Sequence, residues 1–336
     1  MTVYYRAIPC IDPARMFGAL PLCSHSLFFD RVERLERGRK PEIIPNGEVP
    51  TVVLEQMTAK RAPIAGLDFN APAIMGVLNV TPDSFSDGGA FLDIDAAVAR
   101  GRAMVSDGAE IIDIGGESTR PGAATVSAAV EIERIIPVIK ALRSVGITVP
   151  ISVDTRKAQV AQTALDAGAT MLNDVSGLNY CGEYANIATR YDAPICLMHA
   201  QGDPKTMQDA PEYEDVLLDV YDYLSSRVAA AVQAGVSMDR IVLDPGIGFG
   251  KTLLHNMALL RRISLFHTLG CPILLGVSRK RVIGTLTGQE DATKRGPGSA
   301  ALGLMALNQG VQMLRVHDIE MHKQMCDVWR ASRDHR

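Results

Sequence analysis

Polar and ionisable residues that could do chemistry recur along this sequence, each set at the end of a short apolar run. One Asp in such a place is more often a helix cap or an ion-pair partner than a catalytic group. A large set is different, because burying so many polar groups costs free energy unless ligands or partners satisfy them. The set is Asn79; Asp113, with Glu117, Ser118 and Thr119 beyond it; Asp154; Asn173 and Asp174; His199; Asp244; Ser278 and Lys280; and Arg315 and His317.

Three members of this set suit hydrogen bonding to a flat heterocycle. Asp154, Asn173 and Asp244 follow neighbouring apolar runs and offer carboxylate acceptors and an amide donor. A carboxylate can accept two parallel hydrogen bonds from a ring edge that is rich in N–H groups. These residues predict the binding of a nitrogen heterocycle.

The cations of the set suit an anion. Arg315 and His317 are two residues apart on one predicted strand, so their side chains point to the same side. Together with Asn79 they could bind a phosphate group, and Lys280 can reach inward from the preceding run. Acceptors on one side and cations on the other predict a site for a heteroaromatic ring with a phosphate-type substituent.

The stretch IMGVLNVTPDSFSDGG, residues 74–89, has the sequence of a strand that opens into a long loop. Its apolar part ends at Asn79, and small, polar and turn-forming residues follow as far as a Gly-Gly pair. Taken alone, this junction would be an ordinary strand-to-helix connection. Its place among the other polar strand ends favours a loop at the mouth of a site.

Strands and helices are predicted to alternate from residue 73 onward. Runs this uniformly apolar are typical of parallel strands covered by helices, and eight such units predict a (β/α)8 TIM barrel with its site at the carboxyl ends of the strands. A doubly wound open sheet is the alternative, since periodicity cannot show closure. The expected strands are 74–79, 110–114, 150–154, 170–174, 194–199, 241–244, 272–277 and 311–316, and the expected helices are 93–106, 127–144, 157–167, 184–190, 212–234, 253–263, a segment ending at 286, 297–309 and 320–332.

Residues 1–72 differ in composition and pattern from the barrel predicted over 73–336. They hold several prolines, a charged patch at 31–40 and no regular alternation of strands and helices. Short apolar runs at 26–32 and 50–54 could pack against a larger body. We expect an N-terminal extension without chemistry of its own, and its role cannot be predicted from the sequence.

Composition excludes several classes of partner. With 47% hydrophobic residues, 21% charged residues and a net charge of -4, the chain is typical of a soluble globular protein without a bias toward nucleic acid or anionic lipid. No apolar stretch approaches the length of a membrane span, and no targeting segment is evident. The six cysteines are scattered and form no C-x-x-C pair, which favours a reducing, cytoplasmic location.

Two motifs are excluded by their spacing. The run PGIGFGKT at 245–252 ends like a Walker A loop, but the first glycine of that motif would fall on Pro245. We interpret it as a tight turn after Asp244 that brings Phe249 near the pocket. The histidines include no H-x-x-x-H pair, so a dedicated zinc site is not expected.

Long motifs in this sequence resemble those of the pterin-binding (β/α)8 enzymes, and within them those of the dihydropteroate synthases. They span residues 74–318 in the family's order, and each lies at a predicted strand end. The matching stretches are GVLNVTPDSFSDGG, IIDIGGESTRPGA, ISVDTRK, LNDVSG, MHAQGDPKTMQ, DPGIGFGK, GVSRK and RVHD.

The resemblance implies a transferase of folate biosynthesis. The implied reaction condenses 6-hydroxymethyl-7,8-dihydropterin pyrophosphate with p-aminobenzoate and gives 7,8-dihydropteroate and pyrophosphate. Mg2+ is the implied metal, near Asn79, and a homodimer is the implied assembly. No nucleophilic side chain is needed, because a pyrophosphate leaves readily once it is neutralised.

By similarity, each part of the substrates has its own residues. The pterin ring would contact Asp154, Asn173, Asp244 and Lys280. The pyrophosphate would contact Asn79, Arg315 and His317. The p-aminobenzoate pocket would contain Phe85, Thr119, Pro121, Phe249, Lys280 and Arg281. The catalytic group would be Asp87, Lys280, Arg315 and His317, and two loops with Asp83, Phe85 and Asp87 on one and Thr119, Arg120 and Pro121 on the other would close over the site and exclude water.

Two features depart from the family pattern. Arg281 stands where a Ser often follows the S-R-K motif and meets the p-aminobenzoate carboxylate, so the response to sulfonamides is open. The family's chains also usually begin close to the first strand, and this one carries the extension.

Two other functions compete with the synthase. A pterin-dependent methyltransferase acting on a corrinoid partner would share the barrel and the pterin-binding Asp and Asn, but not the TPDSFSDGG loop, the S-R-K lysine or the R-V-H-D anion site. A non-catalytic paralogue that binds pterins would have no use for contacts to a leaving group, such as Arg315.

Overall fold

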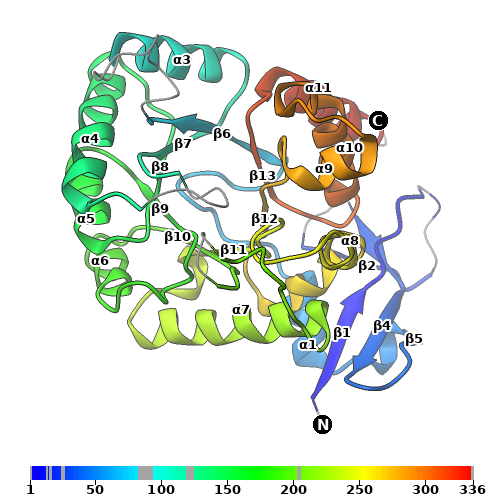
Figure 1. Ribbon diagram of the computed structural model, residues 1–336. Helices are drawn as coiled ribbons and strands as arrows, with labels where there is room; N and C mark the ends of the chain where they lie inside the picture. Colours follow the sequence, from blue (N-terminus) through cyan, green and yellow to red (C-terminus); the bar gives the residue numbers. More distant parts are fainter. Residues whose placement is uncertain are drawn as a thin grey trace.

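A closed ring of parallel strands lies at the centre of the molecule, and helices surround it (Figure 1). The structure, a computed structural model, describes residues 2–12, 14, 17–23, 27–81, 94–118, 125–202 and 206–333. Eight strands pair in the order β11-β10-β9-β8-β7-β6-β13-β12. They are β6 (Ala73–Asn79), β7 (Ile111–Gly115), β8 (Ile151–Asp154), β9 (Met171–Asp174), β10 (Ile195–Met198), β11 (Ile241–Asp244), β12 (Leu274–Leu275) and β13 (Met313–Val316).

The ring closes between its first and last strands. A parallel bridge joins Leu243 to Ile273, and the backbone N–H of Leu243 donates to the carbonyl of Pro272 at 2.9 Å. The predicted (β/α)8 barrel is therefore confirmed, and the open sheet is excluded. The strand predicted at 272–277 is shorter than expected, because only Leu274 and Leu275 pair with β13.

The outer helices begin and end close to the predicted residues. One start was predicted too early: α7 begins at Val216 and not at 212, because the Asp215 carboxylate accepts hydrogen bonds from the backbone N–H groups of Leu217 (3.0 Å) and Leu218 (3.3 Å). None of the described helices is long and apolar enough to cross a membrane. The helices are α3 (Ile94–Ser106), α4 (Ala128–Ser144), α5 (Ala158–Asp166), α6 (Tyr184–Arg190), α7 (Val216–Gln233), α8 (Leu253–Arg261), α9 (Arg281–Thr287), α10 (Gly296–Leu307) and α11 (Ile319–Ala331), with 3-10 turns η1 (Asn46–Glu48), η2 (Met238–Arg240), η3 (Ile263–Leu269) and η4 (Ala292–Lys294).

An apolar plug fills the lower part of the barrel. Its members come from alternate positions of the strands and from the segment before β6, which contributes Ile64 and Phe69. Side chains that alternate along a strand point to the same face, so these positions all face the barrel axis. The strand members are Ala73, Met75, Ile111, Met171, Cys196, Val242, Leu274 and Met313.

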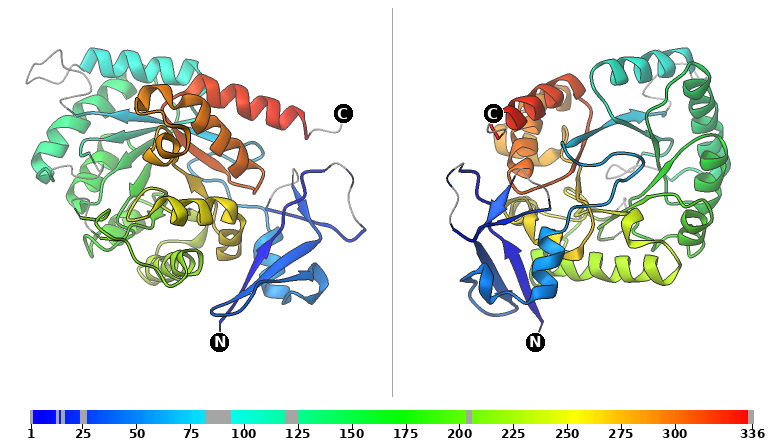
Figure 2. Two further views of the ribbon diagram at one scale, coloured as in Figure 1. Left: turned by 45° about the vertical axis from the view of Figure 1, so that its right-hand side comes forward. Right: turned by 180° about the vertical axis from the view of Figure 1, so that it is seen from behind.

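The described residues among the first 60 form an N-terminal module beside the barrel (Figure 2). The sequence did not predict its strands, because the charged patch at 31–40 hides the alternation of buried and exposed side chains in β4. Arg6 on β1 pairs with Glu33 on β4 at 2.6 Å, which makes burial of that charge tolerable. The module contains an antiparallel sheet of β1 (Val3–Ala7), β4 (Arg31–Glu36) and β5 (Glu42–Pro45), the short pair β2 (Leu20–Pro21) and β3 (Phe28–Phe29), and the helix α1 (Thr51–Thr58).

The module packs against η3, and all seven residues of this turn are buried. Ser264 donates its hydroxyl to the carbonyl of Ala7 at 2.8 Å. At the junction with the barrel, Arg61 is only 4% exposed and donates to the carbonyls of His267 (2.7 Å) and Gln56 (2.8 Å). The module therefore covers apolar barrel surface and satisfies the carbonyls that lie there.

Candidate active site

Polar side chains form a layer directly above the apolar plug. On four strands, a plug residue is followed two positions later by a polar one, so both point into the barrel. The pairs are Ile111 and Asp113, Met171 and Asn173, Val242 and Asp244, and Met313 and Arg315. The plug below excludes water from this layer, and the carboxyl ends of the strands open above it.

Strand register aligns four of the strand ends in one row. Asn79 is paired with Gly115, Gly115 with Asp154, and Asp154 with Asn173. The structure thus brings Asn79, Asp154 and Asn173 to one level of the barrel. Asn79 is half-buried, whereas Asp154 and Asn173 are buried.

Arg315 occupies the middle of the polar layer and joins two carboxylates. Its Nε donates to Asp113 Oδ2 at 2.7 Å, and its Nη2 donates to Asp154 Oδ2 at 2.8 Å. Asn173 Nδ2 also reaches Asp113 Oδ2, at 3.3 Å. Asp113 was named from the sequence only as a strand end and was given no role in the site. The signal for such a role was the alternation of side-chain direction along β7, which makes Asp113 face the barrel axis.

Both carboxylates keep acceptors free for a ligand. Oδ1 of Asp113 and Oδ1 of Asp154 are buried and find no hydrogen-bond donor among the described residues. Burial raises the pKa of Asp154 to about 7, although Arg315 opposes this and Asp113 adds to it. Burial alone would lower the pKa of Arg315, but Asp113 and Asp154 raise it above its usual value. Buried acceptors without a partner mark a place where ligand N–H groups would be bound.

Asp244 and Lys280 border the same space. A Cβ atom built on Gly276 would lie 3.7 Å from Asp244 Oδ2, 3.8 Å from Lys280 Nζ and 3.9 Å from Arg315 Cβ. Burial raises the pKa of Asp244, with Lys280 opposing it. Burial lowers the pKa of Lys280 to about 8, with Asp244 opposing it. A carboxylate and an amine thus lie close to the same point, which Gly276 leaves free of a side chain.

The run 245–251 forms a tight turn that places Phe249 beside Lys280. Lys280 Nζ lies 4.7 Å from the centre of the Phe249 ring and donates to the carbonyl of Ile247 at 2.5 Å. Gly246 has φ +67°, and a Cβ atom there would lie 1.8 Å from the carbonyl oxygen of His199. Only glycine fits at this position.

Lys251 and His199 stabilise this turn by contacts that centre on the Lys251 amine. Lys251 Nζ contacts His199 Nδ1 at 2.8 Å and donates to the carbonyls of Gly246 (2.8 Å) and Phe249 (3.0 Å). Burial lowers the pKa of His199 to about 2, and the nearby Lys251 adds to the effect. His199 is therefore a neutral acceptor within the fold. Lys251 was not predicted, and its place after a Gly-rich turn was the available signal.

Other strand-end residues of the sequence also have structural contacts. Asp174 accepts hydrogen bonds from the backbone N–H groups of Ser176 (2.8 Å) and Leu178 (2.6 Å) and fixes the turn after β9. Glu117 pairs with Lys157 at 2.8 Å. These two strand-end carboxylates are therefore satisfied by groups of the protein itself, as is common for a single acidic residue in such a place.

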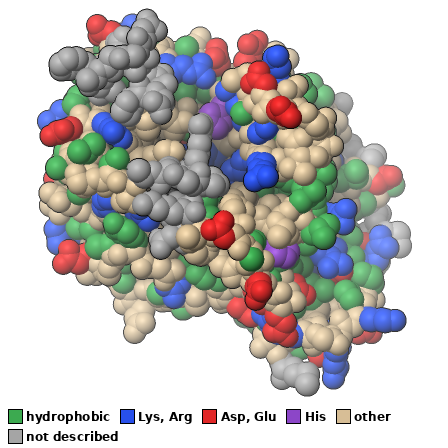
Figure 3. All heavy atoms as spheres, in the orientation of Figure 1, with side chains coloured by type: hydrophobic (Ala, Val, Ile, Leu, Met, Phe, Trp, Pro, Cys, Tyr) green, Lys and Arg blue, Asp and Glu red, His purple; other side chains and the backbone are tan. Residues whose placement is uncertain are grey.

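The remaining predicted site residues lie at the rim. His317 on the β13 side contacts Ser278 Oγ through Nδ1 at 3.0 Å and through its backbone N–H at 3.1 Å. Arg281 is exposed at the start of α9. In Figure 3, basic and histidine side chains border a hollow in the middle of this face. The predicted residues Asp83, Phe85, Asp87, Thr119, Arg120 and Pro121 lie outside the described part of the chain.

No group of three or more His, Cys, Asp and Glu side chains among the described residues is arranged to hold a metal ion.

The family resemblance implies that Asp154 accepts hydrogen bonds from a pterin. Its raised pKa then predicts that the pterin binds more tightly as the pH rises through 7. A pterin donates N–H groups, so it needs the ionised carboxylate, and protonation of Asp154 competes with binding. With a pKa of about 7 in the empty site, the dissociation constant should fall about eightfold from pH 6.0 to pH 7.5.

Calorimetric titration with a pterin at several pH values tests this. Asp154→Asn should bind weakly at every pH, and Asp166→Asn, which changes an exposed carboxylate at the end of α5, should behave like the unchanged protein. Affinity that is constant, or that rises toward acid pH, would contradict the assignment of Asp154.

Comparison with known proteins agrees with this geometry. The family model described as pterin binding enzyme matches residues 75–317. Curated dihydropteroate synthases are 47% identical over 255 residues in Synechocystis sp. and 46% identical over 254 residues in Escherichia coli K12. These alignments cover 76% of this chain and 88% and 89% of those proteins.

Solved structures share the fold. Xanthomonas albilineans dihydropteroate synthase with 4-aminobenzoic acid superposes with a TM-score of 0.75 at 44% identity, covering 81% of this chain and 97% of that one. The same enzyme in complex with 7,8-dihydropteroate gives a TM-score of 0.72 at 40% identity, covering 81% and 98%. With a family match over most of its length and relatives at this identity, the chain belongs to the pterin-binding enzymes and, among them, to the dihydropteroate synthases.

Proposed function

We propose that this chain joins 6-hydroxymethyl-7,8-dihydropterin pyrophosphate to p-aminobenzoate, giving 7,8-dihydropteroate and pyrophosphate for folate biosynthesis. The observation that carries the proposal is the polar layer, in which Arg315 joins Asp113 and Asp154. Each carboxylate keeps one buried oxygen without a partner among the described residues. The relatives are dihydropteroate synthases, and two of the solved structures hold 4-aminobenzoic acid and 7,8-dihydropteroate.

The pterin ring would lie on the polar layer. Asp154 and Asp244 would accept from its N–H groups, the amide of Asn173 would bind the adjoining ring edge, and Lys280 would donate to a ring acceptor. The burial of Asp154, Asn173 and Asp244 strengthens their contacts, because water competes little with a ligand there. The apolar plug below would set the depth at which the ring is held.

The pyrophosphate would extend to the rim, toward Asn79, Arg315 and His317. The bond between the pterin methylene and the pyrophosphate oxygen breaks, and the electron pair leaves with the pyrophosphate. The arylamine nitrogen then attacks the methylene and loses a proton. Cations near the leaving oxygen stabilise the charge that develops there, and the ring delocalises the positive charge left on the methylene.

Mg2+ is part of the proposal, and Asn79 is the residue that would help to hold it. The half-buried amide oxygen of Asn79 is a hard ligand at the rim, and Mg2+ commonly takes its other ligands from phosphates and water. Bound there, the ion would supply charge neutralisation of the leaving pyrophosphate.

The p-aminobenzoate would bind between the Phe249 ring and the rim. Phe249 and Lys280 are in contact, and Arg281 follows Lys280 at the start of α9. Phe85, Thr119 and Pro121 would complete this pocket, and Asp87 would join Lys280, Arg315 and His317 in catalysis. Phe85, Asp87, Thr119 and Pro121 remain predictions from the family resemblance, because they lie outside the described residues.

The direct test is the release of pyrophosphate from the dihydropterin pyrophosphate. Purified protein should release it only when both Mg2+ and p-aminobenzoate are present, with one dihydropteroate formed per pyrophosphate. His317→Ala leaves the contacts of Arg315 with Asp113 and Asp154 in place, and it should lower the rate about a hundredfold through loss of a group near the leaving oxygen.

Two results would end the proposal. Pterin binding without pyrophosphate release would favour a non-catalytic pterin-binding protein. Methyl transfer from a methylated pterin to a corrinoid protein would favour the methyltransferase.

Arg281 is proposed to favour the carboxylate of p-aminobenzoate over a sulfonamide, whose charge is weaker and more spread out. Arg281→Ser should therefore lower the ratio of the sulfonamide inhibition constant to the KM of p-aminobenzoate. We expect a change of about twofold to fivefold, the size of an exposed charge pair. Lys294→Ser, which removes an exposed cation of η4, should leave the ratio unchanged. Equal ratios in all three proteins would rule out this role.

A second copy of the chain is the proposed partner. The outward face of α10 carries Ala301, Leu304 and Met305, and α10 has no charged residue between Gly296 and Leu307. Leu254 of the neighbouring α8 is 79% exposed, and Figure 3 shows apolar side chains over the region of α8. A helix that is apolar on all sides is typical of one covered on all sides.

Sedimentation equilibrium should therefore give the mass of a dimer. Leu304→Glu would place a charge in this face and should give the monomer mass. Val232→Glu, which changes a similarly exposed residue of α7, should remain dimeric. A monomeric unchanged protein, or a dimeric Leu304→Glu, would contradict the proposal.

A cytoplasmic location completes the proposal. All six cysteines are free thiols, as is usual in a reducing compartment.

A further inference from the structure

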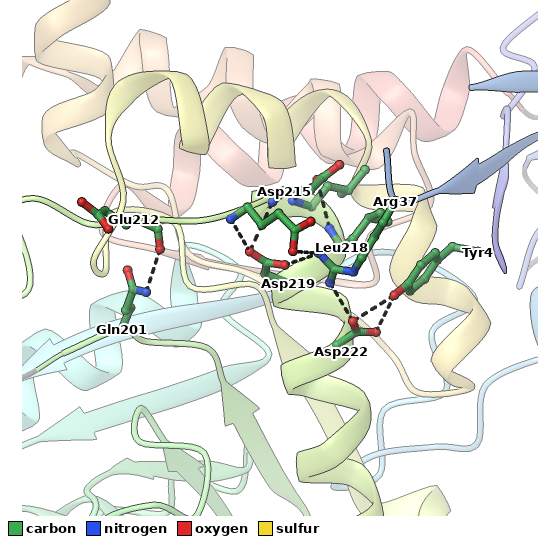
Figure 4. A network of polar contacts seen from close by, with 10 residues as sticks. Tyr4, Arg37, Gln201, Glu212, Asp215, Leu218, Asp219 and Asp222 are labelled. Atoms are coloured by element: carbon green, nitrogen blue, oxygen red, sulfur yellow. Dashed lines mark hydrogen bonds and ion pairs between the residues drawn. The ribbon is translucent and has the colours of Figure 1, made fainter. Parts of the chain in front are cut away.

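The N-terminal module reaches the first turns of α7 through two side chains (Figure 4). Arg37, between β4 and β5, donates from Nη1 to Asp219 Oδ1 at 2.6 Å and from Nη2 to Asp222 Oδ2 at 2.8 Å. Tyr4 on β1 donates its hydroxyl to the Asp222 carboxylate at 2.9 Å, and its ring lies edge-on to Tyr221 with centroids 5.3 Å apart. One guanidinium thus joins two carboxylates on adjacent turns of the helix.

Asp219 links Arg37 to the backbone segment before α7. While Oδ1 faces Arg37, Oδ2 accepts hydrogen bonds from the backbone N–H groups of Glu214 at 2.9 Å and Asp215 at 3.3 Å. The Arg37 side chain is 31% exposed, and that of Asp219 is 27% exposed. Arg37 therefore fixes the rotamer in which Asp219 can hold the backbone ahead of the helix.

That backbone segment in turn holds two loops of the site. The carbonyl of Glu212 accepts from Gln201 Nε2 at 3.0 Å, and the Tyr213 hydroxyl donates to the carbonyl of Gly250 at 2.7 Å. Gln201 follows β10 and Gly250 follows β11. The two loops pack closely, since a Cβ atom on Gly250 would lie 2.4 Å from the Gln201 carbonyl oxygen.

Gly250 directly follows Phe249, whose ring contacts Lys280. A continuous set of contacts therefore runs from Arg37 through Asp219, the 212–215 segment and Gly250 to Phe249. Each step is a hydrogen bond or a peptide bond, so a shift of the 212–215 segment would move the turn that carries Phe249.

We infer that the N-terminal module positions the Phe249 turn of the substrate site, with Arg37 as the positioning residue. The inference rests on the proposed function for its effect on p-aminobenzoate, which would contact Phe249. Arg37 touches no substrate and acts only through Asp219 and the segment before α7.

The first experiment needs no substrate and measures amide hydrogen exchange in the free protein. Arg37→Met should exchange about fivefold faster at residues 213–218 and 249–251, because losing the ion pairs with Asp219, Asp222 and Glu214 loosens that segment. Arg39→Met is the matched control, since Arg39 lies in the same hairpin and its side chain is 61% exposed. Among the described residues, it forms an ion pair only with Glu36, at 3.2 Å. Exchange that is equal in the two variants overturns the inference.

The second experiment measures steady-state kinetics. In Arg37→Met, the KM for p-aminobenzoate should rise about threefold to tenfold, while kcat stays within about twofold and the KM for the pterin pyrophosphate is unchanged. Raising the salt concentration from 0.05 to 0.5 M should raise the same KM in the unchanged protein and in Arg39→Met, but not in Arg37→Met, because salt screens the Arg37 charge pairs. Arg37→Lys should restore most of the affinity.

A general loss of stability would be recognised by thermal melting. If Arg37→Met fails to fold, Tyr4→Phe, which removes only the hydrogen bond to Asp222, should give a smaller change of the same kind in both experiments. A KM that is equal in Arg37→Met and Arg39→Met, or an equal loss for both substrates, would overturn the inference. Should the unchanged protein make no dihydropteroate, the proposed function fails, and the hydrogen-exchange result still decides whether Arg37 positions the turn.

Discussion

A guanidinium held between two buried carboxylates organises the inside of this barrel. Arg315 donates to Asp113 and Asp154. This pairing compensates buried charges that the apolar plug below could not compensate. The geometry leaves one oxygen of each carboxylate without a partner among the described residues. The described part of the protein therefore satisfies these carboxylates only in part, and the remaining hydrogen-bonding capacity is available to a ligand.

The turn after β11 shows how backbone and buried charge cooperate in such a site. Gly246 must approach the carbonyl of His199 more closely than any side chain allows, and Lys251 then binds the carbonyls that the turn leaves unsatisfied. Because His199 is kept neutral by burial, it can accept a hydrogen bond from Lys251 and needs no counter-ion. This support lets Phe249 lie at the edge of the pocket beside Lys280.

The N-terminal module adds a second support from outside the barrel. It covers η3, and Arg37 contacts α7 on the side from which the Gln201 and Gly250 loops are held. A barrel strand fixes only the first residues beyond its end, so long loops need additional contacts to adopt one conformation. In this chain, residues far from the site in sequence supply some of those contacts.

The sequence by itself determined the alternation of strands and helices, the family, and the polar residues that end the strands, because all of these depend on local periodicity and motif spacing. Only the tertiary structure decided which of those residues meet. The Asp174 carboxylate accepts from backbone N–H groups, and the His199 ring contacts the Lys251 amine. Asp113, which was given no role, shares Arg315 with Asp154. The closed barrel was predicted, but strand periodicity alone left the open sheet as an alternative, which the bridge between Leu243 and Ile273 excludes. The pairing of Arg37 with a carboxylate 182 residues away was not predicted. Such contacts follow from how the elements pack in space, and no local pattern in the chain encodes the distance between two residues that far apart.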